Sequence, residues 1–228
     1  MAHTMSDHRR VPSSASPPRQ GLWRRHVHPR LLDVVMDTEE TRAIRARACA
    51  PLVGEVLEIG FGTGLNLPAL PDAVERVLAV DPLHRSMERA AERVAGSHAE
   101  VRLVGSDAQQ LPVADASVDS VLCTWSLCSV DDPVSAVVEI ARVLRPGGQF
   151  HFVEHGLSPD DDVQRWQRRL DRPWSRFAAG CHLDRDLPTI LARGGLQVTA
   201  LQAYYTASEP RMLGWTFEGR ATHASSSA

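Results

Sequence analysis

The sequence predicts an α/β fold built on a parallel sheet. The chain has 228 residues, 43% of them hydrophobic and 23% charged, which is typical of a globular protein long enough to bury a full core. Five short apolar runs are each followed by turn or helix signals. Strands that are separated by helical segments pair in parallel, which gives this fold class. The five runs are residues 53–59, 76–80, 101–104, 118–123 and 149–153.

The segment before the first run predicts a helix over residues 31–49. Its acidic residues come early and its arginines late, which suits the dipole of a helix. Residues 1–30 are predicted to form a flexible polar arm that is rich in arginine, and residues 221–228 a tail.

Two helices between the later strands carry apolar stripes that we expect to face the sheet. The stripes comprise Met87, Ala90, Ala91 and Val94 in the first helix, and Val134, Val137, Val138, Ala141 and Leu144 in the second. Asp132 followed by Pro133 predicts the N-cap and first residue of the second helix. The Arg-Pro-Gly-Gly sequence at 145–148 predicts its end.

Residues 157–193 interrupt the alternation of strands and helices with a charged helical stretch that contains tryptophans. Such an insertion usually covers a functional site. The segments 196–201 and 212–217 predict two last strands. Residues 31–220 are therefore expected to form a single domain with an insertion at 157–193.

Composition excludes several classes of function. The formal net charge of -3 argues against a protein that coats nucleic acid, so no nucleic-acid partner is expected. All 25 basic residues are arginine, which removes mechanisms that need a lysine. The four cysteines form no CxxC pair, so we expect no disulfide scaffold and no metal site, and a reducing, cytoplasmic compartment. No apolar stretch reaches the ~18 residues of a membrane span.

Polar ligands follow three successive predicted strands. Glu58 lies near the end of the first strand, which runs into glycines at positions 60, 62 and 64. Glycines there let the backbone approach a ligand closely, with free N–H groups directed at its negative part. Asp81 closes the second strand, where an acid can bind both hydroxyls of a ribose. Asp107 follows the third strand. A nicotinamide enzyme shares these features, but Leu65 stands where GxGxxG has its third glycine.

These segments resemble the class I methyltransferases that use S-adenosylmethionine. The resemblance covers residues 53–154 through EIGFGTG, AVDP, SDAQQLP, VDSVLCTWSLCSV and EIARVLRPGGQFHFVEH, the last typical of the type 11 subgroup. It implies a Rossmann-like methyltransferase fold, with a seven-stranded, mostly parallel sheet, an antiparallel last strand and helices on both faces. It also implies S-adenosylhomocysteine as product. The implied cofactor-binding residues are Glu58, Gly60, Gly62 and Gly64 for the methionine portion, Asp81 for the ribose, Asp107 and Ala108 for the adenine, and Pro82, Leu83 and Trp125 as flanking residues.

A second resemblance concerns the acceptor. LCSV, the Glu154-His155 pair, LDRPW and GCHL resemble the methyltransferase-like branch that methylates small alkyl thiols. This implies a small-molecule acceptor and favours a thiol. A quinone or phenol C- or O-methyltransferase stays open, as does a module that binds S-adenosylmethionine without turnover.

The residues themselves suggest candidates for the transfer step. A thiol attacks as thiolate, so a histidine that takes its proton or stabilises its charge would assist. His155 is the predicted catalytic residue because it ends the fifth strand. The predicted acceptor-pocket residues are His155, Trp166, Trp174 and His182.

Overall fold

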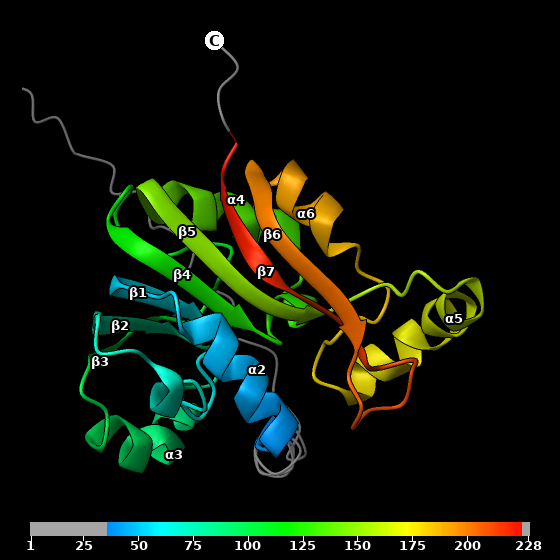
Figure 1. Ribbon diagram of the computed structural model, residues 1–228, viewed down its shortest axis with the longest axis horizontal. Coiled ribbons are helices and arrows are strands. Elements are labelled where there is room, and N and C mark those ends of the chain that lie inside the picture. Colours follow the sequence, from blue (N-terminus) through cyan, green and yellow to red (C-terminus); the bar gives the residue numbers. More distant parts are fainter. Residues whose placement is uncertain (1–35, 225–228) are drawn as a thin grey trace, which may run out of the picture.

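The computed structural model describes residues 36–224 of the chain (Figure 1). The strands in this part are β1 (Gly54–Ile59), β2 (Val74–Val80), β3 (Glu100–Gly105), β4 (Val118–Thr124), β5 (Leu144–His155), β6 (Leu196–Tyr205) and β7 (Trp215–His223). The helices are α2 (Glu39–Cys49), α3 (His84–Ala95), α4 (Pro133–Val143), α5 (Asp161–Phe177) and α6 (Leu187–Arg193). Short 3₁₀ turns lie at Leu67–Ala69 and Leu127–Ser129. The predicted arm, residues 1–30, lies outside the described residues.

The strands form one seven-stranded sheet in the order β3-β2-β1-β4-β5-β7-β6. The pairs among β1 to β5 are parallel, whereas β7 is antiparallel to both β5 and β6. The predicted α/β class is thus confirmed, and so is the antiparallel last strand. β7 continues to His223, into the segment predicted as a tail.

Both faces of the sheet are buried under helices. Along β1, Val56 and Leu57 point to opposite faces and join two separate hydrophobic clusters. The cluster around Val56 includes residues of α2 and α3, and the cluster around Leu57 includes residues of α4 and α6. Figure 1 shows α2 in front of the sheet and α4 and α6 behind it. Glu58 follows Val56 by two positions, so its side chain points to the face that α2 covers.

The predicted helix over 31–49 is interrupted within the described residues, because Met36 is helical but the next two residues are not. Asp37 and Thr38 are not helical, and α2 begins at Glu39 with Thr38 as its N-cap. The Thr38 hydroxyl accepts a hydrogen bond from the backbone N–H of Thr41 at 3.2 Å. Residues 31–35 lie outside the described part of the chain. The capping residue Thr38 sets the start of α2, and the distribution of charges along the sequence does not reveal this cap.

The predicted apolar stripes are correct only in part. The buried positions of α4 are Ala136, Val137, Ile140 and Val143. Val138, predicted to face the sheet, is 49% exposed, and Ala91 of α3 is also exposed. Because α4 carries apolar residues around most of its circumference, periodicity alone could not choose which stripe faces the sheet.

The predicted insertion contains two different helices. Figure 1 shows α5 standing away from the sheet, at its side. In contrast α6 packs with Leu187 and Leu191 in the same cluster as α4. The last strands are longer than predicted, and β7 begins at Trp215 rather than at residue 212. No helix among residues 36–224 is long and apolar enough to cross a bilayer.

Candidate active site

The strand order of the sheet changes direction between β1 and β4, which makes this pair its topological switch point. Strands added after β1 go to one side as β2 and β3, and those added from β4 onward go to the other. In such sheets the loops that leave the carboxyl ends of the two central strands turn to opposite faces and leave room for a ligand. The glycine loop follows β1 and the turn at Trp125 follows β4, so both predicted segments border this switch point.

The three predicted glycines adopt left-handed backbone conformations. Their φ angles are +72° at Gly60, +57° at Gly62 and +76° at Gly64, which other residues rarely adopt. A Cβ at Gly60 would overlap the side chain of Ser126, so this glycine lets β1 and the turn after β4 approach closely. A Cβ at Gly62 would meet only the carbonyl of Gly60, at 3.9 Å. The loop therefore has open space beside Gly62.

Asp81 links the ends of β1 and β2. Its Oδ2 accepts a hydrogen bond from the backbone N–H of Gly62 at 2.7 Å, and its Oδ1 accepts one from Leu83 at 2.7 Å. The residue is only 5% exposed. Pro82 is exposed and Leu83 half-buried beside it. The predicted ribose acid thus fixes the glycine loop in place.

Glu58 belongs to a buried polar network. Its Oε1 accepts a hydrogen bond from Asn66 Nδ2 at 2.8 Å, and the same amide donates to Thr124 Oγ1 at 3.0 Å. Oε2 is buried without a hydrogen-bond partner among the described residues. Burial raises the pKa of Glu58 to about 7, although Asn66 and the charge of Arg45 act in the opposite direction. One carboxylate oxygen is thus left to accept a donor from a ligand.

Arg45 completes this network, and the sequence reasoning missed it. One guanidinium nitrogen donates to Asn66 Oδ1 and to Thr124 Oγ1, each at 3.1 Å, and the group lies 4.7 Å from the ring centroid of Trp125. Arg45 is only 5% exposed. A signal was present, because Arg45 interrupts the buried stripe of α2 formed with Ile44 and Ala48.

The third strand end is more exposed. Asp107 Oδ1 accepts hydrogen bonds from the backbone N–H of Gln109 at 2.8 Å and from its side-chain amide at 3.1 Å. Ala108 is buried in the cluster under α4. The structure thus brings Ala108 to the sheet and leaves the Asp107 carboxylate at the surface of the turn.

The turn after β4 is held by Glu154, a second residue whose structural role the sequence did not reveal. This buried carboxylate accepts backbone N–H groups of Ser126 and Leu127 at 2.9 Å and of Cys128 at 3.1 Å. Burial raises its pKa, while these donors lower it. Trp125 adopts a left-handed φ of +49° at the start of the turn.

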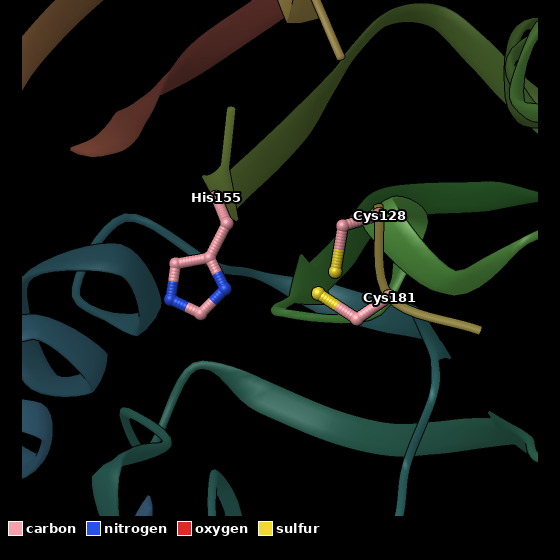
Figure 2. A group of neighbouring side chains, drawn as sticks. All are labelled: Cys128, His155 and Cys181. Carbon is pink, nitrogen blue, oxygen red and sulfur yellow. The ribbon is translucent and has the colours of Figure 1, made fainter. Parts of the chain in front are cut away.

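His155 lies among polar side chains at the end of β5. Figure 2 shows its imidazole and the thiols of Cys128 and Cys181 turned toward one another. On the other side of the ring, Nε2 lies 3.4 Å from Glu209 Oε2. Burial alone lowers the pKa of His155, but Cys181 and Glu209 outweigh it and raise the pKa to about 10. Cys128 donates to Cys181, and this contact and His155 lower the pKa of the Cys181 thiol.

The predicted acceptor-pocket residues do not all meet. Trp174 lies close enough to Cys181 to lower the pKa of its thiol further, so it joins His155 at this cluster. His182 instead pairs through Nδ1 with Asp171 Oδ2 at 2.8 Å. Trp166 is 55% exposed on α5, beside the guanidinium of Arg169.

Comparisons with known proteins show which families the chain is similar to. The family model for the methyltransferase domain matches residues 57–152. A thiol S-methyltransferase of Rattus norvegicus is 38% identical over 139 residues, which are 58% of this chain and 55% of the rat protein. A phosphatidylethanolamine N-methyltransferase of Cereibacter sphaeroides is 38% identical over 147 residues, covering 64% of this chain and 71% of that protein.

The fold has solved counterparts. The crystal structure of a SAM-dependent methyltransferase of Thermotoga maritima superposes with a TM-score of 0.63 at 21% identity, over 89% of this chain and 100% of that one. At this identity the likeness concerns the fold alone. The chain also spans little more than half the length of the rat thiol S-methyltransferase that it matches.

Proposed function

Because the chain belongs to the class I S-adenosylmethionine-dependent methyltransferases, we propose that it transfers the methyl group of this donor to a small thiol. The sulfonium of the donor, when bound, supplies a methyl group that is already electrophilic. The protein therefore has to hold the donor, align an acceptor in line with the sulfonium and exclude water. No covalent protein nucleophile is required.

The residues around the switch point between β1 and β4 fit this donor. Its methionine portion carries an ammonium group, and the buried, unpartnered Oε2 of Glu58 is an acceptor for such a group. The open space beside Gly62 leaves room for a ligand against the glycine loop. Gly60 and Gly64 give this loop its shape.

The other proposed cofactor contacts come from residues that lie at or just after the ends of the strands. Asp81 would accept hydrogen bonds from the ribose hydroxyls while its N–H contacts keep the carboxylate in place. Asp107 and Ala108 would border the adenine, and Pro82, Leu83 and Trp125 would flank the cofactor. The guanidinium of Arg45 lies over the ring of Trp125 and would hold this ring in position beside the cofactor.

The observation that carries the thiol proposal is the thiolate-stabilising environment at the end of β5. There a hydrogen bond from Cys128, together with the nearby His155, lowers the pKa of one thiol, that of Cys181. An acceptor thiol that approaches His155 would meet the same positive charge. A histidine whose pKa is raised to about 10 is protonated at neutral pH, so stabilising the thiolate charge is the role that fits, rather than taking its proton.

The proposal is tested by a screen of acceptors with isotopically labelled donor, read by mass spectrometry. Small aliphatic and aromatic thiols should be methylated faster than phenols, quinols and amines, because a thiolate is the better nucleophile. His155→Ala should lower the turnover number about a hundred- to a thousandfold, because the charge that stabilises the thiolate is lost, while the affinity for S-adenosylhomocysteine stays nearly constant. His98→Ala, an exposed histidine on the chain before β3, is the matched control.

Other outcomes decide between the alternatives. Dominant transfer to oxygen or carbon would contradict the thiol acceptor and support a quinone or phenol methyltransferase. Binding of the donor without any product across the panel would support a module that binds the cofactor without turnover.

A further inference from the structure

Three side chains of types that ligate metals come together from separate segments of the chain. Cys128 lies in the 3₁₀ turn after β4, His155 ends β5, and Cys181 follows α5. Figure 2 shows both sulfur atoms on the side of His155 Nδ1. Two thiols and an imidazole are ligands that zinc binds in proteins, and they form the three-ligand set Cys₂His.

The spacing of these atoms suits a single ion. The ligand atoms of Cys128, His155 and Cys181 all lie within 4.8 Å of one another. Zinc lies about 2.3 Å from a thiolate sulfur and about 2.0 Å from an imidazole nitrogen, so two sulfur ligands of one ion lie at most about 4.6 Å apart. Binding therefore needs little movement of the side chains.

The backbone around both cysteines is firmly held. Glu154 accepts the N–H of Cys128, and Arg185 donates to the carbonyls of Leu127 at 2.6 Å and Val130 at 2.5 Å. The carbonyl of Cys128 accepts the N–H of His182 at 2.9 Å, which joins the two cysteine segments directly. The cysteines thus keep their relative position without an ion.

The third ligand is also oriented by its neighbours. The backbone of His155 pairs with Thr216 in the sheet. Its Nε2 faces Glu209, whose carboxylate accepts the Thr206 hydroxyl at 2.8 Å. A carboxylate behind the distal nitrogen of a histidine is the usual outer partner of a zinc ligand, because it fixes the ring and its tautomer.

We propose that Cys128, His155 and Cys181 bind one divalent cation of the zinc class. Two thiolates balance the charge of the ion, and the neutral imidazole completes the three protein ligands, which leave a fourth position open. The ion takes the place of the protons on Cys128 and His155. The proposal does not rest on the proposed methyl transfer, since the ligand set alone defines the site. With the ion bound, the cation rather than a protonated His155 would supply the positive charge near an acceptor thiolate.

The test measures metal rather than activity. The full chain is treated with a chelator under reducing conditions and is then loaded with Zn²⁺ or Co²⁺. After desalting, mass spectrometry measures how many metal ions each chain retains. About one ion per chain should remain, and the Co²⁺ form should show a thiolate-to-metal charge-transfer band. Cys128→Ser and Cys181→Ser should each abolish this band, and Glu209→Gln should weaken binding about 10- to 100-fold.

Cys49→Ala is the matched control, because Cys49 is a buried free cysteine of α2, and it should keep one ion per chain. A second measurement needs no variant: Zn²⁺ should slow the alkylation of Cys181 in the unaltered chain. Full occupancy in both serine variants overturns the proposal. So does an unaltered chain that retains no ion although Cys128 and Cys181 are reduced.

Discussion

Glu58 and Asp81 are buried carboxylates at neighbouring strand ends, but their hydrogen-bond partners differ. Both oxygens of Asp81 accept backbone N–H groups, whereas one oxygen of Glu58 has no partner among the described residues. Asp81 therefore shapes the glycine loop as well as bordering the proposed ribose position. Glu58 is the group with acceptor capacity left for a positively charged ligand.

Asp81→Ala should weaken binding of S-adenosylhomocysteine by about 1.5 to 3 kcal/mol, because charge-assisted hydrogen bonds to the ribose would be lost. The loop would also lose the acceptor for the N–H of Gly62. Isothermal titration calorimetry measures the affinity. Asp72→Ala removes the same charge from an exposed position and should leave the affinity unchanged. Unchanged affinity in a folded Asp81→Ala protein would contradict the assignment.

For single residues, the sequence was informative where a pattern of adjacent positions marks the residue. Glu58, the glycine loop and Asp81 lie at strand ends, so local patterns were enough to select them. Arg45 reaches Asn66 and Thr124 only through the packing of α2 on the sheet. Cys128 and Cys181 have no metal-binding spacing and meet only in the folded chain, so the proposed metal site could not be anticipated from the sequence.

Among the elements, the glycine loop after β1 and the turn after β4 depend on each other. Gly60 can lie against Ser126 only because it has no side chain. The element types and the N-cap at Asp132 were predictable, since the Asp132 side chain accepts the N–H of Val134 at 3.1 Å. The buried face of α4 was not, because tertiary packing chose between two apolar stripes of that helix.

Gly60→Ala should destabilise the fold more than Gly147→Ala. Both glycines have a left-handed φ, +72° and +85°, so alanine has a similar backbone cost at each. At Gly147 a Cβ would meet nothing within 4 Å, whereas at Gly60 it would overlap Ser126. We expect an additional loss of about 1 to 3 kcal/mol at Gly60, measured by urea denaturation. Equal losses of unfolding free energy in the two variants would show that the close approach of Gly60 to Ser126 does not affect stability.

For the molecule as a whole, two buried groups give opposite pH dependences of stability. The pKa of Glu58 is raised to about 7, so the folded state keeps a proton that the unfolded state loses, and stability falls as pH rises toward 7. Burial, with the charge of Arg220, lowers the pKa of His151 to about 4, so stability falls as pH drops below the ordinary histidine value. The two effects should cancel between pH about 4.5 and about 6.5.

Single variants should expose each effect. Relative to the unaltered chain, His151→Gln should lose about 1.4 kcal/mol of unfolding free energy per pH unit as pH rises through this window. Glu58→Gln should gain stability with rising pH at the same rate. Urea denaturation at several pH values measures both slopes, with the exposed His98→Gln as control. Parallel curves for all the proteins would contradict the two buried titrations.

The position of β7 also affects how the protein is made. β5 gains its second neighbour only from β7, near the carboxyl end of the described chain. While the ribosome is still adding residues 156–214, the backbone of β5 presents an unpaired edge, and Phe150 and Phe152 lack part of their final cover. Such an edge is where nascent chains aggregate or attract chaperones. Synthesis of the last strand is therefore the step that protects the strand on which His155 lies.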